Sequence, residues 1–354
     1  MAMPEINILF KTLAKTASIR SARGVACVVV KDDAVEGKYV YTREKQITQT
    51  YDEFNSDLVK EAFNKYGVTK LVVYAIKKTG GTLKDALDNL KKVEINYLAC
   101  NFALEENDIT LIKQFKETRV KNNMDLQIIA NTPADDEYFI NFASTGISVN
   151  GSTIEPHRFM CKLAFILSSI PQTESATYYV LDDVTAVNEL ENEDEAVEQG
   201  KLFITFDGEK YKLSRAVNSK TTLAANEKKD LKKIKITEGK IIVKGDIYKV
   251  FRDKYIGKCN NDYNDRLSLV SEINRYLTNL AYEGILNIDY DNHVELDVQA
   301  MRDYMETEVD TDTSDMKDID VLKDVEGLCG SKVFIKGQVR FIDAMEDITL
   351  VLYM

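Results

Sequence analysis

Three groups of residues in this sequence have the types and spacing that metal or phosphate binding requires, and the first is a histidine–cysteine pair. His157 and Cys161 lie four residues apart in a segment predicted to be helical, so both side chains could share one face, as metal ligands do. The chain has 2 histidines and no second ligand pair beside this one, which favours a structural role for a buried free cysteine. The other histidine, His293, stands near Asp291 on a predicted strand and is better interpreted as a surface side chain than as a catalyst.

A glycine-rich turn is the candidate for phosphate binding. Gly80-Gly81-Thr82 lies between a predicted strand and a predicted helix, where doubly wound folds place a nucleotide loop. The turn lacks the third glycine of the dinucleotide fingerprint and the Gly-Lys-Thr of a P-loop. An ordinary turn with Thr82 as the helix N-cap is therefore the favoured interpretation.

An acidic repeat imitates the start of a calcium loop. Asp310, Asp312 and Asp315 have the spacing of its first ligands, but Asp315 stands where the loop needs glycine. Val321 stands where the loop needs a bidentate glutamate, so calcium is rejected. None of the three groups predicts a catalytic residue, a cofactor or a metal.

Positive charge gathers in one segment of an otherwise acidic chain. A solvated strand edge and a contact surface for an acidic partner explain the lysines of residues 227–235 equally well. Arg266 and Arg275 lie about 90° apart around a predicted helix, so they could border one positive face or pair with Glu272 and neighbouring acids. The residues of this possible basic surface are Lys232, Lys233, Lys235, Arg266 and Arg275.

Length and composition indicate a soluble globular chain of two or three domains. The 354 residues carry a formal net charge of −12, which argues against nucleic acid as a partner. No apolar run is long enough to cross a bilayer, and no signal sequence is recognisable, so we expect synthesis in the cytoplasm. The 5 scattered cysteines fit reduced thiols better than disulfides or zinc.

Predicted strands and helices alternate regularly in the first two thirds of the chain. Repeated strand–helix–strand units of this length predict a mostly parallel sheet with helices on both faces, in an α/β domain from about residue 20 to 205. The continuous apolar run at 24–30 is typical of a strand buried on both faces. Further strands are expected at 70–76, 96–100, 126–130, 177–180 and 202–206, and helices at 51–66, 83–90, 105–121 and 156–169.

The last third has a different pattern. We expect a hairpin turn at Asp207-Gly208, strands at 211–217 and 234–243, and two closing strands after the acidic stretch at 305–323. A long amphipathic helix is predicted over 262–282, with Asp262 or Asn264 as N-cap and Gly284 as its left-handed end.

Both chain ends are apolar enough to be strands. Such ends are normally tied into a sheet, either within their own subunit or, by strand donation, in a neighbour that lacks a strand. The residues expected in this intersubunit strand exchange are Ile6, Ile8, Phe10, Thr349, Leu350, Val351, Leu352 and Tyr353.

The order of motifs in the last 150 residues or so, about one domain's length, resembles a known family. The motifs are Arg-Ala-Val-Asn-Ser-Lys-Thr-Thr-Leu at 215–223, Tyr-Ile-Gly-Lys-Cys-Asn-Asn at 255–261, an arginine-bearing helix, Tyr-Leu-x-x-Leu at 276–280 and the apolar stretch at 333–346. This order is similar to the C-terminal domain of contractile tail sheath proteins, which form the outer sleeve of contractile phage tails and of R-type bacteriocins (tailocins). At the N-terminus Glu5 replaces the glycine that the family usually has.

The resemblance implies a fold and a domain plan. It implies an outer α/β domain with a mostly parallel sheet at 21–205, an inner α+β domain at 206–345, an N-terminal arm at 1–20 that packs with the inner domain, and a C-terminal strand arm at 346–354. Both arms would donate strands to neighbouring subunits.

The resemblance also implies a structural function. The subunit would assemble with itself into stacked hexameric rings, forming a helical sleeve around a tail tube. The sleeve would contract from a metastable extended state, driving the tube through a cell envelope. Expected partners are the tube protein, the baseplate and the tail terminator or collar proteins, with neither nucleic acid binding nor membrane insertion, in a released phage tail or phage-tail-like particle.

Two other interpretations stay open. The 21–205 domain could be a small-molecule enzyme with its ligand at the carboxyl ends of the strands, near residues 79–82 and 131–133. The chain could also be a virion protein that does not contract and shares only the C-terminal module.

Overall fold

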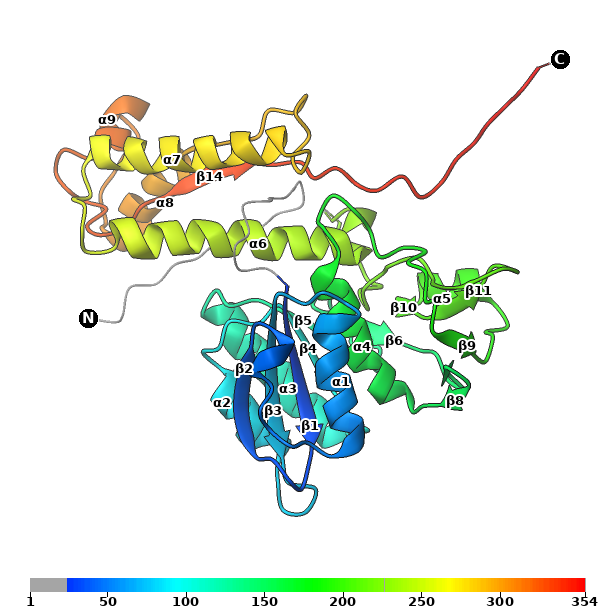
Figure 1. Cartoon of the computed structure of the whole chain (residues 1–354). Coiled ribbons are helices and arrows are strands. Elements are labelled where there is room, and N and C mark those ends of the chain that lie inside the picture. Colours follow the sequence, from blue (N-terminus) through cyan, green and yellow to red (C-terminus); the bar gives the residue numbers. More distant parts are fainter. Residues whose placement is uncertain (1–23, 226, 354) are drawn as a thin grey trace. The chain divides into compact units, whose positions relative to one another are not determined.

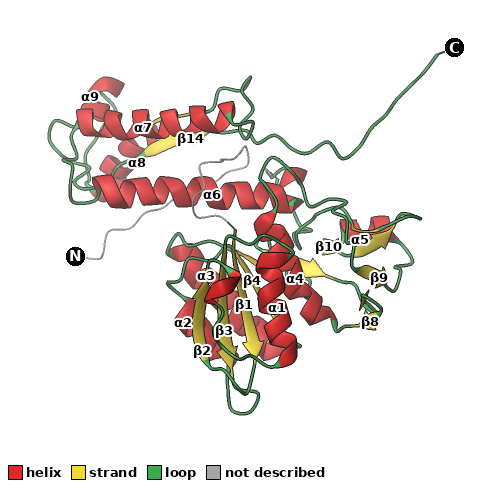
Figure 2. Ribbon diagram, in the orientation of Figure 1, coloured by secondary structure: helices red, strands yellow, loops and turns green. Residues whose placement is uncertain are grey.

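The computed structural model describes residues 24–225 and 227–353 (Figure 1). Its contacts divide the chain into two compact units. Of the described residues, the α/β unit contains 24–241 and, further along the chain, the segment from Asp343 onward, whereas the C-terminal unit is Ile242–Ile342. Figure 2 shows the helices and strands of both units.

A seven-stranded sheet organises the α/β unit, in the order β10-β6-β5-β4-β1-β3-β2. All neighbouring strands are parallel except β2, which pairs antiparallel with β3, so the predicted mostly parallel sheet is confirmed. The strands are β1 (Val25–Lys31), β2 (Gly37–Tyr41), β3 (Lys70–Ile76), β4 (Tyr97–Cys100), β5 (Gln127–Ala130), β6 (Phe139–Phe142) and β10 (Lys201–Leu202).

Two apolar layers cover the faces of this sheet. Along β1, Ala26 and Val28 face a core shared with α1 and α4, whereas Cys27 and Val29 face a core shared with α2 and α3. Every side chain of a strand buried on both faces points into an apolar core, which explains the unbroken apolar run of β1. The helices are α1 (Glu53–Asn64), α2 (Leu83–Leu90), α3 (Glu106–Lys121) and α4 (Pro156–Ser169).

Smaller elements complete the α/β unit. The expected hairpin at Asp207-Gly208 joins β11 to β12, whereas the expected strand at 177–180 is reduced to one bridge between Val180 and Lys212. The elements are β7 (Ser148–Val149), β8 (Ser152–Thr153), β9 (Val184–Ala186), β11 (Ile204–Phe206), β12 (Tyr211–Leu213), α5 (Glu193–Glu198) and the short 3-10 turns Glu44–Gln46 and Lys229–Lys232.

The C-terminal unit is built on two long helices and a two-stranded sheet. Its apolar core joins α6 and α7 with β13 and β14, and includes Leu277 and Leu286. Asp262 caps α7, accepting a hydrogen bond from Asp265 N at 2.9 Å, and Gly284 follows the helix with φ +72°, as predicted. The elements are α6 (Ile234–Val250), a π-helical turn (Phe251–Tyr255), α7 (Tyr263–Tyr282), β13 (His293–Leu296), α8 (Val298–Glu308), α9 (Asp318–Lys323) and β14 (Ile335–Gln338).

Two predictions for this part of the chain were wrong. Residues 234–243 are not a strand but the first half of α6, where β-branched Ile234, Ile236 and Thr237 are buried by tertiary packing that overrides their strand preference. The closing strands are limited to β14 and a single bridge from Phe341 to Leu286.

The division between the units also differs from the boundary expected near residue 205. Residues 206–241 pack with the sheet domain, because Ser219 N donates to Phe139 O at 2.7 Å and Lys240 pairs with Glu137 at 2.5 Å. Ile234 lies in the same apolar core as β1. The chain therefore passes from one unit to the other inside α6.

Candidate assembly interface

The carboxyl edge of the parallel sheet is where a doubly wound enzyme would hold its ligand. Strand order reverses between β1 and β4, and Asp32 and Asn101 directly follow those two strands. Asn55 Nδ2 donates to Asp32 Oδ2 at 2.9 Å, and Asn101 Nδ2 donates to Asn55 Oδ1 at 2.5 Å. Asp52 N gives Asp32 a further hydrogen bond at 2.9 Å. This position is filled by mutually bonded side chains of the protein itself.

Burial alone would raise the pKa of the Asp32 carboxyl. Hydrogen bonds from Asn55 and from the backbone of Asp52, Ala34 and Val35 outweigh burial and hold that pKa below its usual value. Asp32 is therefore a charged structural centre with four donors around it, rather than a proton acceptor waiting for a substrate.

The other candidate site residues from the sequence have contacts that are typical of structural roles. Thr82 Oγ1 accepts from Asp85 N at 3.2 Å, so the Gly80 turn is a helix start, as expected. Cys161 is completely buried, and burial raises the pKa of its thiol, whereas His157 is only half-buried. His293 Nδ1 lies 3.0 Å from Asp291 Oδ2. Within residues 24–225 and 227–353, no three acids, histidines or cysteines are placed to hold a metal.

The structure corrects the expectation of one basic surface. Arg266 is buried and bonds Asp324 at 3.2 Å, and Lys235 is buried with Nζ 3.1 Å from Thr173 O. Burial lowers the pKa of Lys235. Lys233 binds carboxylates of its own chain, which leaves Lys232, half-buried, and Arg275, exposed and 4.0 Å from Glu272.

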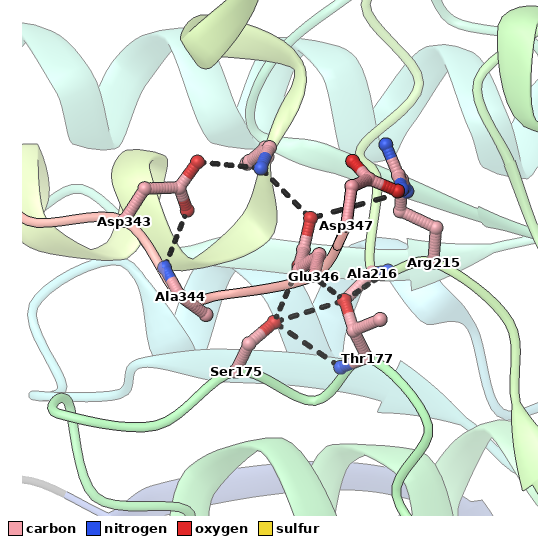
Figure 3. A network of polar contacts seen from close by, with 9 residues as sticks. Ser175, Thr177, Arg215, Ala216, Asp343, Ala344, Glu346 and Asp347 are labelled. Carbon is pink, nitrogen blue, oxygen red and sulfur yellow. Dashed lines mark hydrogen bonds and ion pairs between the residues drawn. The ribbon is translucent and has the colours of Figure 1, made fainter. Parts of the chain in front are cut away.

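Lys233 instead binds Asp343 and Glu346, in a polar network where the chain's last segment meets the α/β unit; Figure 3 shows this network. Its Nζ lies 2.5 Å from Asp343 Oδ2 and 2.8 Å from Glu346 Oε2. Thr177 Oγ1 donates to Glu346 Oε1 at 2.6 Å, and Arg215 forms an ion pair with Asp347. We call residues 343–347, held in this way, the arm base.

The charges of the arm base stabilise one another. Burial favours the neutral form of Glu346, but hydrogen bonds from Lys233 and Thr177 and the positive charges of Lys233 and Arg215 hold its pKa below the usual value. Burial likewise opposes the charge of Lys233, yet Asp343 and Glu346 raise its pKa. Both groups are consequently ionised over a wide range around neutral pH.

Beyond the arm base, residues 348–353 form an apolar arm. The side chains are strongly exposed, with Ile348 at 88%, Leu352 at 79% and Tyr353 at 93% of their full accessible surface. The arm has no strand partner in the part of the chain that the structure describes. An exposed run of this kind is costly in water unless another surface covers it. Thr349, Leu350 and Val351 share this exposure, whereas Ile6, Ile8 and Phe10 lie outside the described residues.

The small sheet of the C-terminal unit has an open edge that could receive such an arm. Asp297 N donates to Phe334 O at 2.9 Å, so the alternation of the antiparallel ladder turns the backbone groups of Ile335, Gly337 and Val339 away from β13. Among the described residues none bonds those outward groups. The opposite edge, at Val294, is already bonded by the Asn274 side chain at 2.7 and 2.9 Å.

Sequence reasoning missed the arm base. Its partners lie far apart in the sequence. Lys233 is 113 residues from Glu346, and Thr177 is 169 residues from Glu346. The only signal was the group of three acids directly before an apolar chain end.

These features define a class of protein before any comparison is made. An α/β unit whose enzyme-like crevice is filled, an exposed apolar arm and an open sheet edge are typical of a subunit that assembles with copies of itself.

Comparisons with known proteins agree with this class. Residues 226–354 match the family described as the Phage tail sheath C-terminal domain. The tail sheath protein of Clostridium phage phiCD119 is 29% identical over 98% of this chain and 97% of its own length. By these matches the C-terminal third of the chain is similar to the tail sheath C-terminal domain, and the whole chain is similar to a phage tail sheath protein.

Solved structures share the fold. The sheath tail protein of Desulfitobacterium hafniense superposes with a TM-score of 0.64 at 14% identity, over 82% of this chain and 93% of that one. The helical sheath of the anti-feeding prophage (AFP) in its contracted state gives 0.67 at 14% identity, over 100% and 99%. The fold therefore extends over both units described above.

Proposed function

We propose that this chain is the repeating subunit of a contractile sheath, and the observation that carries the proposal is the exposed apolar arm on a well-anchored base. Identical subunits joined head to tail, by contacts that do not close, produce a helical tube. An arm on one copy and an open edge on the next are contacts of this kind.

Strand donation would join the copies. The arm of one subunit would pair with the outward backbone groups of β14 in another, completing its two-stranded sheet through main-chain hydrogen bonds. A two-stranded sheet is only marginally stable by itself, so an added strand gains both pairing and burial. The N-terminal arm, residues 1–20, would make a second link of the same type.

Contraction would follow from the two-unit construction. The donated strands keep subunits tethered, while the α/β units on the outside exchange one set of contacts for another with greater burial. The extended sheath, formed on a tube as template, is then a metastable state whose release performs work. This mechanism needs no nucleotide, because the energy is stored during assembly.

The partners follow from this arrangement. Stacked hexameric rings would surround a tail tube protein, with a baseplate at one end and terminator or collar proteins at the other. Among the basic residues considered above, Lys232 and Arg275 keep the accessibility that tube contact needs. The particle would be a phage tail or an R-type bacteriocin, assembled in the bacterial cytoplasm and then released.

Deletion of residues 349–354 tests the proposal directly. The arm pairs with no strand among the described residues, so the shortened protein should fold and unfold like the full chain but form no sheaths. Negative-stain microscopy, alone and with co-expressed tube protein, gives the readout; hollow striated sleeves are expected only from the full chain. Loss of folding, or sleeves from the shortened chain, would reject strand donation by this arm.

A further inference from the structure

We infer that the arm base is a clamp that fixes the C-terminal arm to the α/β unit, so that a donated arm connects a neighbouring copy to this unit of its own chain. The inference rests on the proposed function and adds a mechanical role for residues 343–347.

The contacts of the clamp are concentrated on one buried carboxylate. The side chain of Glu346 is 5% exposed and binds Lys233, Thr177 and Ser175, the last at 3.2 Å. Asp347, by contrast, is 77% exposed, and among the described residues Arg215 is the one that pairs with it. A partly buried charge pair with several hydrogen bonds is stronger than a surface ion pair. Glu346 is therefore the main fixed point of the clamp.

The groups that bind Glu346 lie on segments of the α/β unit that are bonded to one another. Thr177 Oγ1 also accepts from Ala216 N at 3.0 Å, which joins the 175–177 and 215–217 segments (Figure 3). Val217 forms a bridge with Lys233, whose neighbour Ile234 is buried in the main core. Three segments thus meet at the clamp, and each is tied to the sheet domain.

The order of contacts along the chain determines which unit receives tension from a donated arm. The backbone of Ile342 still contacts Ile285 of the C-terminal unit, but Asp343 is already bound to the α/β unit, and the unbroken run of exposed side chains begins at Asp347. Tension on a donated arm would consequently reach Glu346 before it reached β14. Movement of the α/β unit and movement of the linked neighbour would then be coupled.

The mobility of the arm base in the unassembled full-length chain tests the clamp itself. Met345 is itself exposed but lies between the anchored Asp343 and Glu346, so a nitroxide on Met345→Cys should move more slowly than one on Val351→Cys, both in a Cys259→Ser background because Cys259 is exposed. Lys233→Met or Glu346→Gln should make the label at 345 about tenfold faster, approaching the one at 351. Lys229→Met removes an exposed lysine outside the clamp and should change nothing.

Sheath yield tests whether the clamp serves assembly. Lys233→Glu and Glu346→Lys should each reduce yield about tenfold, and the double exchange should restore part of it, because opposite charges again face each other. A label at 345 that is as mobile as one at 351 in the parent chain, or unaffected by the clamp variants, overturns the inference. Full yield from chains with a released arm base overturns it as well. A fixed arm base in a parent chain that never forms sheaths would contradict the proposed function instead of the clamp.

Discussion

The guanidinium of Arg266 lies inside the C-terminal unit with every nitrogen bonded to an oxygen of that unit. Its Nε donates to Asn261 Oδ1 at 2.8 Å, one terminal nitrogen to Leu322 O at 3.3 Å, and the other to Asn261 O and to Asp324. Asp324 in turn accepts from Leu328 N at 2.7 Å. This arginine joins α7 to the segment after α9, and its positive charge is paired with Asp324 inside the fold.

We expect Arg266→Met to destabilise the protein by about 3 kcal/mol, because Asp324 would be left as an uncompensated buried charge. Chemical unfolding followed by circular dichroism measures the loss. Arg275→Met, on the same helix but exposed, is the matched control and should stay within about 0.5 kcal/mol of the parent. If the Arg266→Met chain is as stable as the parent but cannot assemble on tubes, Arg266 contacts the tube after all.

At the scale of elements, β14 is the edge where a second copy is expected to bind. The outward N–H of Val339 is one of the donors that a new strand would use, and proline removes that donor. Val339→Pro should therefore abolish sheath assembly while the chain stays folded. Val339→Ala, which shortens the side chain but keeps the N–H, should still assemble. Size-exclusion chromatography and microscopy of both variants measure assembly. Loss of assembly in Val339→Pro alone indicates pairing at the β14 edge, whereas loss in both variants indicates that the Val339 side chain acts by packing.

How far the sequence predicted the elements depended on what holds each one. Helices α2, α4 and α7 and strand β3 were predicted at or within a residue of their ends, because local caps and a clear apolar period determine them. Helix α6 was predicted as a strand, since Ile-Lys-Ile-Thr favours β structure locally and only tertiary burial selects the helix. The apolar arm was predicted from composition, but its base depends on pairs more than 100 residues apart, which no local pattern reveals.

At the scale of the whole molecule, the two halves of the proposed interface lie on different parts of one chain. The arm follows a base fixed to the α/β unit, and the open edge belongs to the C-terminal unit. Each subunit would therefore donate and accept at the same time. Growth then continues as long as every added subunit has both halves, and it stops where one half is missing.

A chain without residues 349–354 keeps the open edge of β14 but has no arm to donate. Added in small amounts to the full chain, it should therefore enter the growing sheath and limit its extension, so that mean length falls as its fraction rises. Lengths measured on micrographs at one part in twenty to one part in two give the dose dependence. The shortened chain carrying Val339→Pro in addition lacks both halves and should leave lengths unchanged. Equal lengths with and without the shortened chain would show that assembly does not depend on pairing between arm and edge.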